Sequence, residues 1–278
     1  MRSVKMVQTV QTVQTERMEQ TVQTELAVLM VHQEHIFIHR LTPPNATRLH
    51  ALRDRGAKLL VIHETIEGRI AQQGAEISPA AMQERLRQYL ALQGADAVAV
   101  TDLKGRSWGV PGTALRHSAD VADYYPPTYE RAAGLRVANH VVSKQVFLDW
   151  DFHIQSFHGL PVTLVGHNPE LGVEAAENWE ALKRLFAEHR FYIHTANPSY
   201  EDGFNMAMCE AMAAGLPVIT NAHPRTPITD GVDGFVARSP DEARRAAEEA
   251  EAIAIAEAKA SATAKCRPLW CRPTSTHS

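Results

Sequence analysis

Residues 197–237 read NPSYEDGFNMAMCEAMAAGLPVITNAHPRTPITDGVDGFVA and contain the strongest local pattern in the chain. A β-rich run ends near Ala196, a loop with two adjacent acids follows, and a helical pattern begins at about Phe204. The helical pattern closes on Gly215, which suits the position after a helix end, where left-handed backbone favours glycine. The next β-rich run, LPVITNA, covers residues 216–222. This order predicts a βαβ unit and therefore a parallel sheet.

The loop between this strand and this helix combines a helix start with acidic side chains. Free amides and the positive end of the helix dipole attract an anion at a helix start. Gly203 lets the backbone turn or approach a ligand closely, and the acids Glu201 and Asp202 precede it. Glu210 lies about a turn and a half into the helix, and its side chain leans back toward the helix start. Amides for a phosphate, flanked by carboxylates for hydroxyl groups, are what a nucleotide sugar requires.

Strand and helix patterns alternate along most of the chain. The other β-rich runs are HIFIHRL (35–41), AKLLVIHE (57–64), ADAVAVTDL (95–103), LPVTLVGH (160–167) and HRFYIHTA (189–196). Helical patterns fall between several of them, over residues 79–94, 178–189 and 205–215. Such alternation predicts an α/β protein whose parallel sheets are buried on both faces and bind ligands at the carboxyl ends of their strands.

The two ends of the chain depart from this alternation. VQT recurs four times near the N-terminus, and a three-residue period fits neither a strand nor a packed helix face. We interpret residues 1–26 as a low-complexity extension. The sequence from Pro240 is rich in Ala and Glu and predicts a helix, and residues 256–278 are interpreted as a tail. Cys266 and Cys271 lie in this tail without further ligands nearby, so no metal site is predicted there.

One short stretch predicts a boundary between two domains. YYPPTY (124–129) cannot continue a helix or a central strand. It separates an N-terminal domain over 27–127 from a C-terminal domain over 128–255.

Composition narrows the class of protein. The 278 residues are 45% hydrophobic and 22% charged, as in globular proteins, and 28 basic against 32 acidic residues give a net charge of −4. That balance argues against a nucleic-acid partner. No apolar run approaches the roughly 18 residues that span a bilayer, and the first residues lack the apolar core of a secretory signal. Three cysteines are too few for a disulfide framework. We therefore expect a cytoplasmic protein with no integral membrane segment, while peripheral contact with a membrane stays open.

Residues 197–237 resemble the donor-binding signature of retaining glycosyltransferases of family 4, which have the GT-B fold. The usual pattern of that family is P-S-x-x-E-G-F-G-x-x-x-x-E-A-M-A-x-G-x-P-V-I, followed by D-G-x-x-G-F. Here Asp202 replaces the first glutamate, Glu210 matches the second, and Asp230 to Phe235 match the closing segment. The resemblance implies two Rossmann-like units that face each other across a cleft. It also implies that the N-terminal, acceptor-side unit is incomplete, because its first βα units have no counterpart here.

Weaker matches extend the resemblance over about residues 35–240. VANHVVSK (137–144) occupies the place of the family's G-R-x-x-x-x-K motif, with Lys144 present and Asn139 where the arginine is expected. LVGHNPE (164–170) parallels the strand that ends in V-G-x-G. In the first unit, His39 and His63 end strands where the family often has histidines that face the cleft.

The resemblance assigns roles to these positions. In the family the first acid contacts the transferred sugar and the second binds the ribose of the nucleotide, while loop and helix-start amides hold the sugar and the diphosphate. It implies the catalytic residues Asp202, Glu210 and His63, and the substrate-binding residues Lys144, Glu201, Gly203, Phe204, Asn205, Asn139 and His167.

The activity implied is transfer of a sugar, of the hexosyltransferase type, from a UDP-, GDP- or ADP-linked donor to an unidentified acceptor with retention of configuration. No metal or other cofactor is needed in that scheme, because cationic side chains and the helix dipole replace it. Two alternatives stay open. One is a fragment that binds nucleotide sugars without turnover. The other is a histidine phosphatase, favoured by the motifs Arg116-His117-Ser118 and Gly166-His167-Asn168-Pro169, although it leaves residues 197–237 unexplained.

Overall fold

The computed structural model describes residues 58–73, 77–110 and 119–263. The chain divides into two compact units, residues 1–116 and 117–278. Outside the described residues lie the VQT repeat, the strand predicted over 35–41, His39, Cys266 and Cys271.

The predicted domain boundary, YYPPTY, lies inside the second unit. There the ring of Tyr124 meets the rings of Trp179 and Phe186 edge-on, with centroids 5.8 Å and 6.3 Å away. These contacts attach the start of the second unit to its own core.

The described part of the first unit is a small α/β unit built on two parallel strands. β1 (Lys58–Ile62) pairs with β2 (Ala95–Ala99), and the helices are α4 (Ile66–Gln73), α5 (Pro79–Gln93) and α6 (Asp102–Ser107). Ser78 caps α5 and Thr101 caps α6 by accepting hydrogen bonds from helix amides, so polar side chains define where both helices begin. The core joins both strands to α4, α5 and the indole of Trp108.

The second unit contains a five-stranded parallel sheet. Its strands are β3 (Gly134–Val137), β4 (Val162–Val165), β5 (Phe191–His194), β6 (Val218–Asn221) and β7 (Gly234–Ala237), in the order β4-β3-β5-β6-β7. Each pair of neighbours is parallel. The α/β fold with parallel sheets is thereby confirmed, whereas a cleft between the two units stays a prediction.

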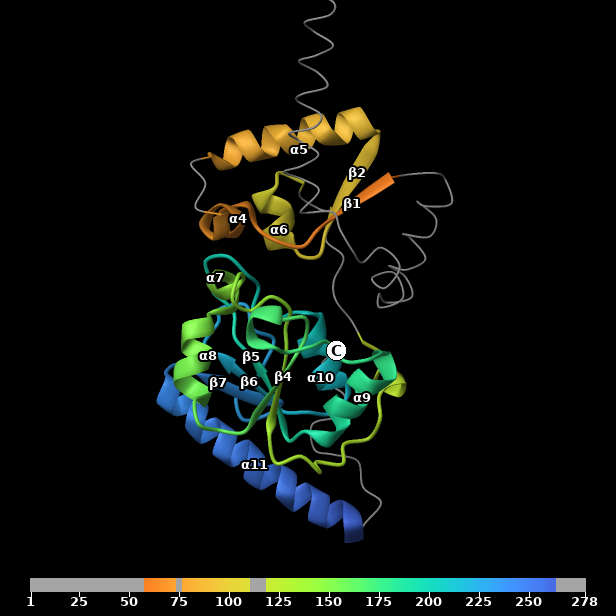
Figure 1. Cartoon of the computed structure of the whole chain (residues 1–278), viewed down its shortest axis with the longest axis vertical. Helices are drawn as coiled ribbons and strands as arrows, with labels where there is room; N and C mark the ends of the chain where they lie inside the picture. Colours follow the sequence, from red (N-terminus) through yellow and green to blue (C-terminus); the bar gives the residue numbers. More distant parts are fainter. Residues whose placement is uncertain (1–57, 74–76, 111–118, 264–278) are drawn as a thin grey trace, which may run out of the picture. The chain divides into compact units, whose positions relative to one another are not determined.

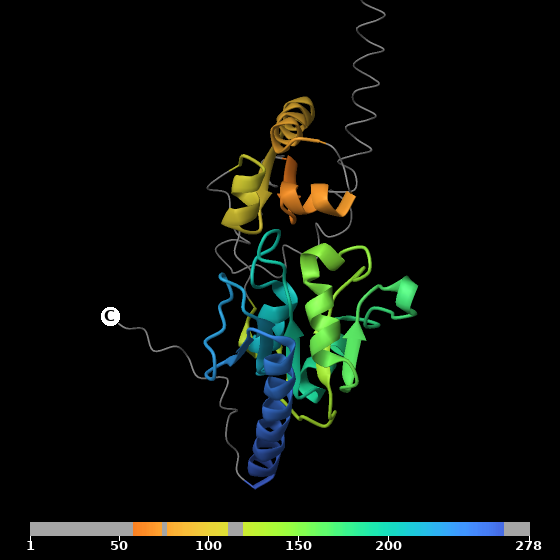
Figure 2. The same cartoon turned by 90° about the vertical axis from the view of Figure 1, so that its left-hand side faces the viewer.

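Helices cover both faces of this sheet (Figure 1). α9 (Trp179–Glu188) and α10 (Met206–Ala213) share one core cluster with the sheet. α8 (Trp150–Phe157) and α11 (Pro240–Thr263) share the cluster on the other face, and Figure 2 shows these two helices from their own side. The second unit is therefore a three-layer sandwich with helices outside and the sheet inside.

The structure of the second unit contains three strands and three helices that the sequence predicts. The strand runs over 160–167, 189–196 and 216–222 contain β4, β5 and β6, the helical runs over 178–189 and 205–215 contain α9 and α10, and the Ala- and Glu-rich sequence from Pro240 forms α11. Gly215 has φ 84°, as a glycine after a helix end requires. α11 continues to Thr263, into the stretch interpreted as a tail. No helix of the described residues, the 24-residue α11 included, has both the length and the apolarity to cross a membrane.

Several short elements carry no sequence prediction. In the second unit these are β3, β7, α7 (Gln145–Leu148), α8 and the 3-10 turns η1 (Val121–Asp123) and η2 (Pro169–Leu171). β3 has four residues and one of them is Arg136, so the apolar run that marks a buried parallel strand is interrupted.

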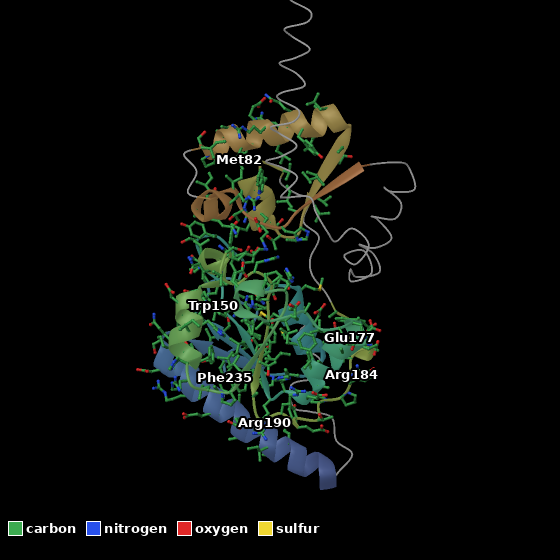
Figure 3. All side chains as sticks on the ribbon, in the orientation of Figure 1. Met82, Trp150, Glu177, Arg184, Arg190 and Phe235 are labelled. Atoms are coloured by element: carbon green, nitrogen blue, oxygen red, sulfur yellow. The ribbon has the colours of Figure 1, made fainter. Side chains whose placement is uncertain are left out.

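Truncation of a core side chain tests the packing of α9 against the sheet. Phe186 is fully buried, so we expect Phe186→Ala to lower the free energy of unfolding of the second unit by about 3–5 kcal/mol. Arg184→Ala, on the exposed face of the same helix (Figure 3), is the matched control and should change it by no more than about 0.5 kcal/mol. Urea denaturation followed by circular dichroism measures both. Equal effects of the two substitutions would mean that α9 is not packed as described.

Candidate functional site

The carboxyl ends of five parallel strands lie at one edge of the second sheet. The chain continues from β3 to β4 on one side of β3, and β5 lies on the other side. α8, which follows β3, and α10, which follows β5, cover opposite faces. The strand order thus reverses between β3 and β5, and ligands of α/β sheets bind at such a point. We use the name carboxyl edge for the loops that follow the strands: residues 138–144, 166–168, 195–205 and 222–226.

The loops after β3 and β4 are hydrogen-bonded to each other. The Asn139 side chain accepts a hydrogen bond from the His167 amide at 2.8 Å. The buried Asn168 side chain donates to the Ala138 carbonyl and accepts from the Val141 amide, both at 2.8 Å. Asn139 and His167, two predicted substrate-binding residues, are therefore brought together, and Asn139 serves the contact between the loops.

A buried arginine joins the ends of β3 and β5. The Arg136 guanidinium donates to the Thr195 hydroxyl at 3.0 Å and to the Thr195 carbonyl at 3.2 Å, and it lies 5.9 Å from the centre of the Trp150 ring. β3 and β5 share only two paired positions in the ladder, Gly134 with Phe191 and Leu135 with Tyr192. Arg136 thus connects the strands beyond the point where their backbones stop pairing. Burial lowers the pKa of Arg136 to about 10, so the guanidinium is charged at neutral pH.

An asparagine at the end of β6 fixes the start of the next loop. The Asn221 side chain accepts from the Ala196 amide at 3.1 Å and donates to the Ala196 carbonyl at 2.9 Å. The same amide group donates to the Asp149 carboxylate at 2.9 Å. Burial raises the pKa of the Asp149 carboxyl, and this hydrogen bond partly offsets that shift by lowering it. Ala196 immediately precedes loop 197–205, so the loop leaves the sheet in a defined direction.

Loop 197–205 is closely packed against loop 222–226. A Cβ atom on Gly203 would lie 2.5 Å from both His223 Nδ1 and the Thr226 amide nitrogen. The Arg225 guanidinium donates to the Pro198 carbonyl at 3.1 Å and to the Glu201 carbonyl at 2.9 Å. Gly203 therefore permits a close approach, as the sequence predicts, but the approach seen here is to a neighbouring loop.

The two predicted catalytic acids of this unit have different neighbours. The Asp202 carboxylate lies 3.6 Å from the Arg225 guanidinium. Burial raises the pKa of the Tyr192 phenol, and the charge of Glu210, in the second turn of α10, also acts to raise it. The Tyr192 hydroxyl donates to the Val137 carbonyl, at the end of β3, at 3.4 Å. With 4% and 2% of their surfaces exposed, Asp202 and Glu210 belong to the packed interior as well as to the edge.

The other predicted binding residues of this unit lie along the same edge. Phe204 is half-buried against the α9–α10 core, and Asn205 caps α10 by accepting from the Met208 amide at 2.9 Å. Lys144 is half-buried at the start of α7. Glu201 accepts hydrogen bonds through its carbonyl from Arg225 and through its carboxylate from the Asp202 amide at 3.3 Å.

His63 belongs to the first unit, where it follows β1 and is exposed. Its catalytic role stays a prediction. Of the phosphatase motifs, Arg116 to Ser118 lie outside the described residues. The Gly166-to-Pro169 motif lies at the carboxyl edge, where Asn168 binds the β3 loop as described above.

Sequence reasoning overlooked several residues that belong to the edge or contact it. They are Arg136, His140, Asp149, Asn221, His223 and Arg225. Two signals were available: Arg136 is a charged residue between apolar ones, and Asn221 is a polar residue at the end of a predicted strand. Asp149 gave none, because its role depends on a turn between two short helices in which it has φ 46°.

One family model matches the sequence. Residues 137–254, which are 118 of the 278 residues, match the family described as Glycosyl transferases group 1. The match runs from the last residue of β3 into α11 and includes the whole carboxyl edge of the second unit. It supports a relationship of this segment to glycosyltransferases. No curated protein matches the sequence.

Several solved structures are similar at low identity. The structure of TarM is 12% identical with a TM-score of 0.38 and covers 57% of this chain, which spans only 36% of TarM. The structure of the Anabaena protein Alr3699/HepE in complex with UDP is 15% identical, with a TM-score of 0.44. The similarity covers 81% of this chain and 72% of the HepE chain. The structure of WaaG, a glycosyltransferase involved in lipopolysaccharide biosynthesis, is 17% identical, with a TM-score of 0.45, and the similarity covers 80% of this chain and 78% of the WaaG chain. These values establish neither substrate nor mechanism for this chain.

A buried histidine lies beside the arginine of the edge. The His153 ring stacks on the Trp150 ring, with centroids 4.3 Å apart and planes 13° from parallel, and it is 6% exposed. Burial, with a smaller contribution from the Arg136 charge, lowers the pKa of His153 to about 3. The ring is therefore neutral in the folded protein throughout the physiological range.

This pKa predicts acid destabilisation with a defined sign. Below pH 6.5 the unfolded chain binds a proton at His153 that the folded chain excludes down to about pH 3, so stability is lost as pH falls from about 6.5. His153→Phe keeps a stacked ring without titration, and between pH 6.5 and 5 it should lose about 2 kcal/mol less than the parent protein. His158→Gln, at an exposed position, serves as the control and should follow the parent. Urea denaturation at each pH measures this, and parallel profiles for parent and His153→Phe would contradict it.

Proposed function

We propose that the second unit binds a nucleotide-sugar donor at its carboxyl edge, and that the chain transfers the sugar to an acceptor with retention of configuration. One observation carries the proposal: the segment that matches the glycosyltransferase family model contains the reversal point between β3 and β5, with Asp202 and Glu210 on the βα segment that follows β5. The donor would be UDP-, GDP- or ADP-linked, and the sugar a hexose. The cytoplasm is the proposed compartment.

The diphosphate of the donor would lie at the start of α10. The first amides of a helix have no partner within the helix, and the dipole adds positive charge there. Gly203, Phe204 and Asn205 lead into this helix start, and Lys144 at the start of α7 would add a charge. Glu201, Asn139 and His167, at the same carboxyl edge, complete the proposed binding residues.

The two carboxylates would divide the recognition of the donor. Asp202 would accept hydrogen bonds from the hydroxyl groups of the transferred sugar, and Glu210 from the ribose. Hydrogen bonds to a carboxylate are roughly twice as strong as neutral ones. Because both groups are largely buried, a donor bound there would exchange solvent for fixed dipoles in a medium of low dielectric constant.

Transfer in this scheme depends on position and charge. Donor and acceptor are held together, so the reaction loses much of its entropic cost. Charge that develops on the leaving diphosphate is stabilised by Lys144 and by the amides at the α10 start, which are already oriented. No metal is required for this step. The first unit would hold the acceptor, and a catalytic role of His63 in that unit is part of the proposal.

Isosteric substitutions of the two acids test the proposal. Glu210→Gln should weaken nucleotide binding by about 1–3 kcal/mol, because a charge-assisted hydrogen bond is lost. Asp202→Asn should retain the affinity for the free nucleotide and reduce transfer from the nucleotide sugar. Calorimetric titration with UDP, GDP and ADP measures binding, and a coupled assay with the matching sugars measures transfer.

The control is Glu249→Gln on the exposed surface of α11, which should alter neither quantity. Melting temperatures of all variants are needed, because Asp202 and Glu210 are also packed in the interior. Equal losses of nucleotide affinity in folded Asp202→Asn and Glu210→Gln would contradict the division of roles. Tight nucleotide binding without any transfer would favour the alternative of a binding fragment.

A further inference from the structure

Two histidine rings meet where the loops after β3 and β4 touch. The ring centres of His140 and His167 are 5.1 Å apart, and the ring planes are 80° from parallel. His167 is exposed and His140 is half-exposed, so solvent reaches the pair. Within the described part of the chain, neither ring takes part in a hydrogen bond or an ion pair.

The backbone holds the two residues in fixed relative positions. The His140 amide donates to the His167 carbonyl at 2.9 Å, and the His167 amide donates to the Asn139 side chain at 2.8 Å. Asn168, which is buried, adds its two hydrogen bonds to the β3 loop. A ligand that needs both rings would therefore find them already placed.

The backbone of this pair is also strained. His140 has φ 55°, in the left-handed region that side chains other than glycine seldom adopt. Gly166 precedes His167 with φ 140°, and a Cβ atom there would lie 2.1 Å from the Ala138 carbonyl oxygen. Strained backbone of this kind concentrates at ligand sites and persists only where the surroundings enforce it.

We propose that His140 and His167 together bind a zinc ion or a similar divalent transition metal. Zinc bonds to imidazole nitrogen at about 2.0–2.1 Å, and two imidazoles on one tetrahedral zinc have ring centres about 5.2 Å apart. The observed separation of 5.1 Å matches that value. An edge-to-face contact of two rings without metal has a similar separation, and protection of both rings by Zn²⁺ distinguishes a metal site from such a contact.

The site would be an open one. Among the described residues no three metal-ligating side chains gather, so the protein supplies two ligands and leaves two tetrahedral positions. Water or an anionic oxygen would fill them. Imidazole pairs prefer zinc, nickel and copper, whereas magnesium prefers oxygen ligands. This proposal does not depend on sugar transfer, which is proposed to proceed without a metal.

Chemical footprinting of the full chain tests the site. Diethyl pyrocarbonate modifies free imidazole nitrogens, and peptide mass spectrometry reports each of the chain's 14 histidines separately. Saturating Zn²⁺ should slow modification of His140 and His167 together by about tenfold, since a nitrogen bound to metal is protected. Mg²⁺ should have no effect, and modification of the exposed His158 should be the same with and without Zn²⁺.

Two variants complete the test. His140→Asn keeps a residue that tolerates left-handed backbone, and it should abolish the protection of His167 by Zn²⁺. His167→Gln should likewise abolish the protection of His140, and circular dichroism checks that both variants fold. Unchanged modification of the pair in Zn²⁺ would overturn the proposal and leave an aromatic contact. Protection of His167 that persists in folded His140→Asn would overturn it as well.

Discussion

The charge of Arg136 inside the second unit is the constraint on which the carboxyl edge depends. A buried guanidinium is costly unless hydrogen bonds and nearby dipoles compensate for the lost water. Thr195 supplies two acceptors, and the Trp150 ring lies over the guanidinium. The compensation requires β3, β5 and the start of α8 to meet at one point, which is also where β3 and β5 stop pairing. Where the strand order reverses, β3 and β5 are thus connected by the Arg136 side chain and not by backbone hydrogen bonds of the sheet.

Around this point the loops bind one another. Asn221 fixes Ala196, Arg225 fixes the carbonyls of loop 197–205, and Asn168 fixes the loop after β3. Loops whose polar groups are already paired need little reorganisation when a ligand binds. A site whose dipoles are already oriented stabilises charge effectively. Asp202 is buried within this arrangement, beside Arg225. The residues proposed to bind the donor therefore also stabilise the fold. Both ligand affinity and the free energy of unfolding have to be measured for a substitution at the edge.

The sequence predicts the long, strongly patterned elements, and it locates the segment that carries the site. Runs such as 189–196 and 216–222 are apolar enough to mark buried parallel strands, and the helical patterns over 178–189 and 205–215 begin at Asn178 and Asn205, which cap α9 and α10. β3 was missed because Arg136 interrupts its apolar run. Asp149 could not be found, because its contact with Asn221 joins positions 72 residues apart. The sequence predicts that the backbone turns or approaches a ligand closely at Gly203, and the structure shows a close approach to a second loop, whose identity the sequence does not specify.

Hydrogen exchange of the full chain, alone and with saturating UDP, GDP or ADP in turn, tests the central claim, that a donor nucleotide binds at the carboxyl edge of the second unit. We expect one of the three nucleotides to slow exchange in peptides that cover 138–144 and 197–210, because bound ligand stabilises the loops that contact it. Peptides from the last turn of α9, which leads into the start of β5, should exchange at the same rate in all samples. Unchanged exchange at the edge with all three nucleotides, or protection confined to α9, would contradict the account.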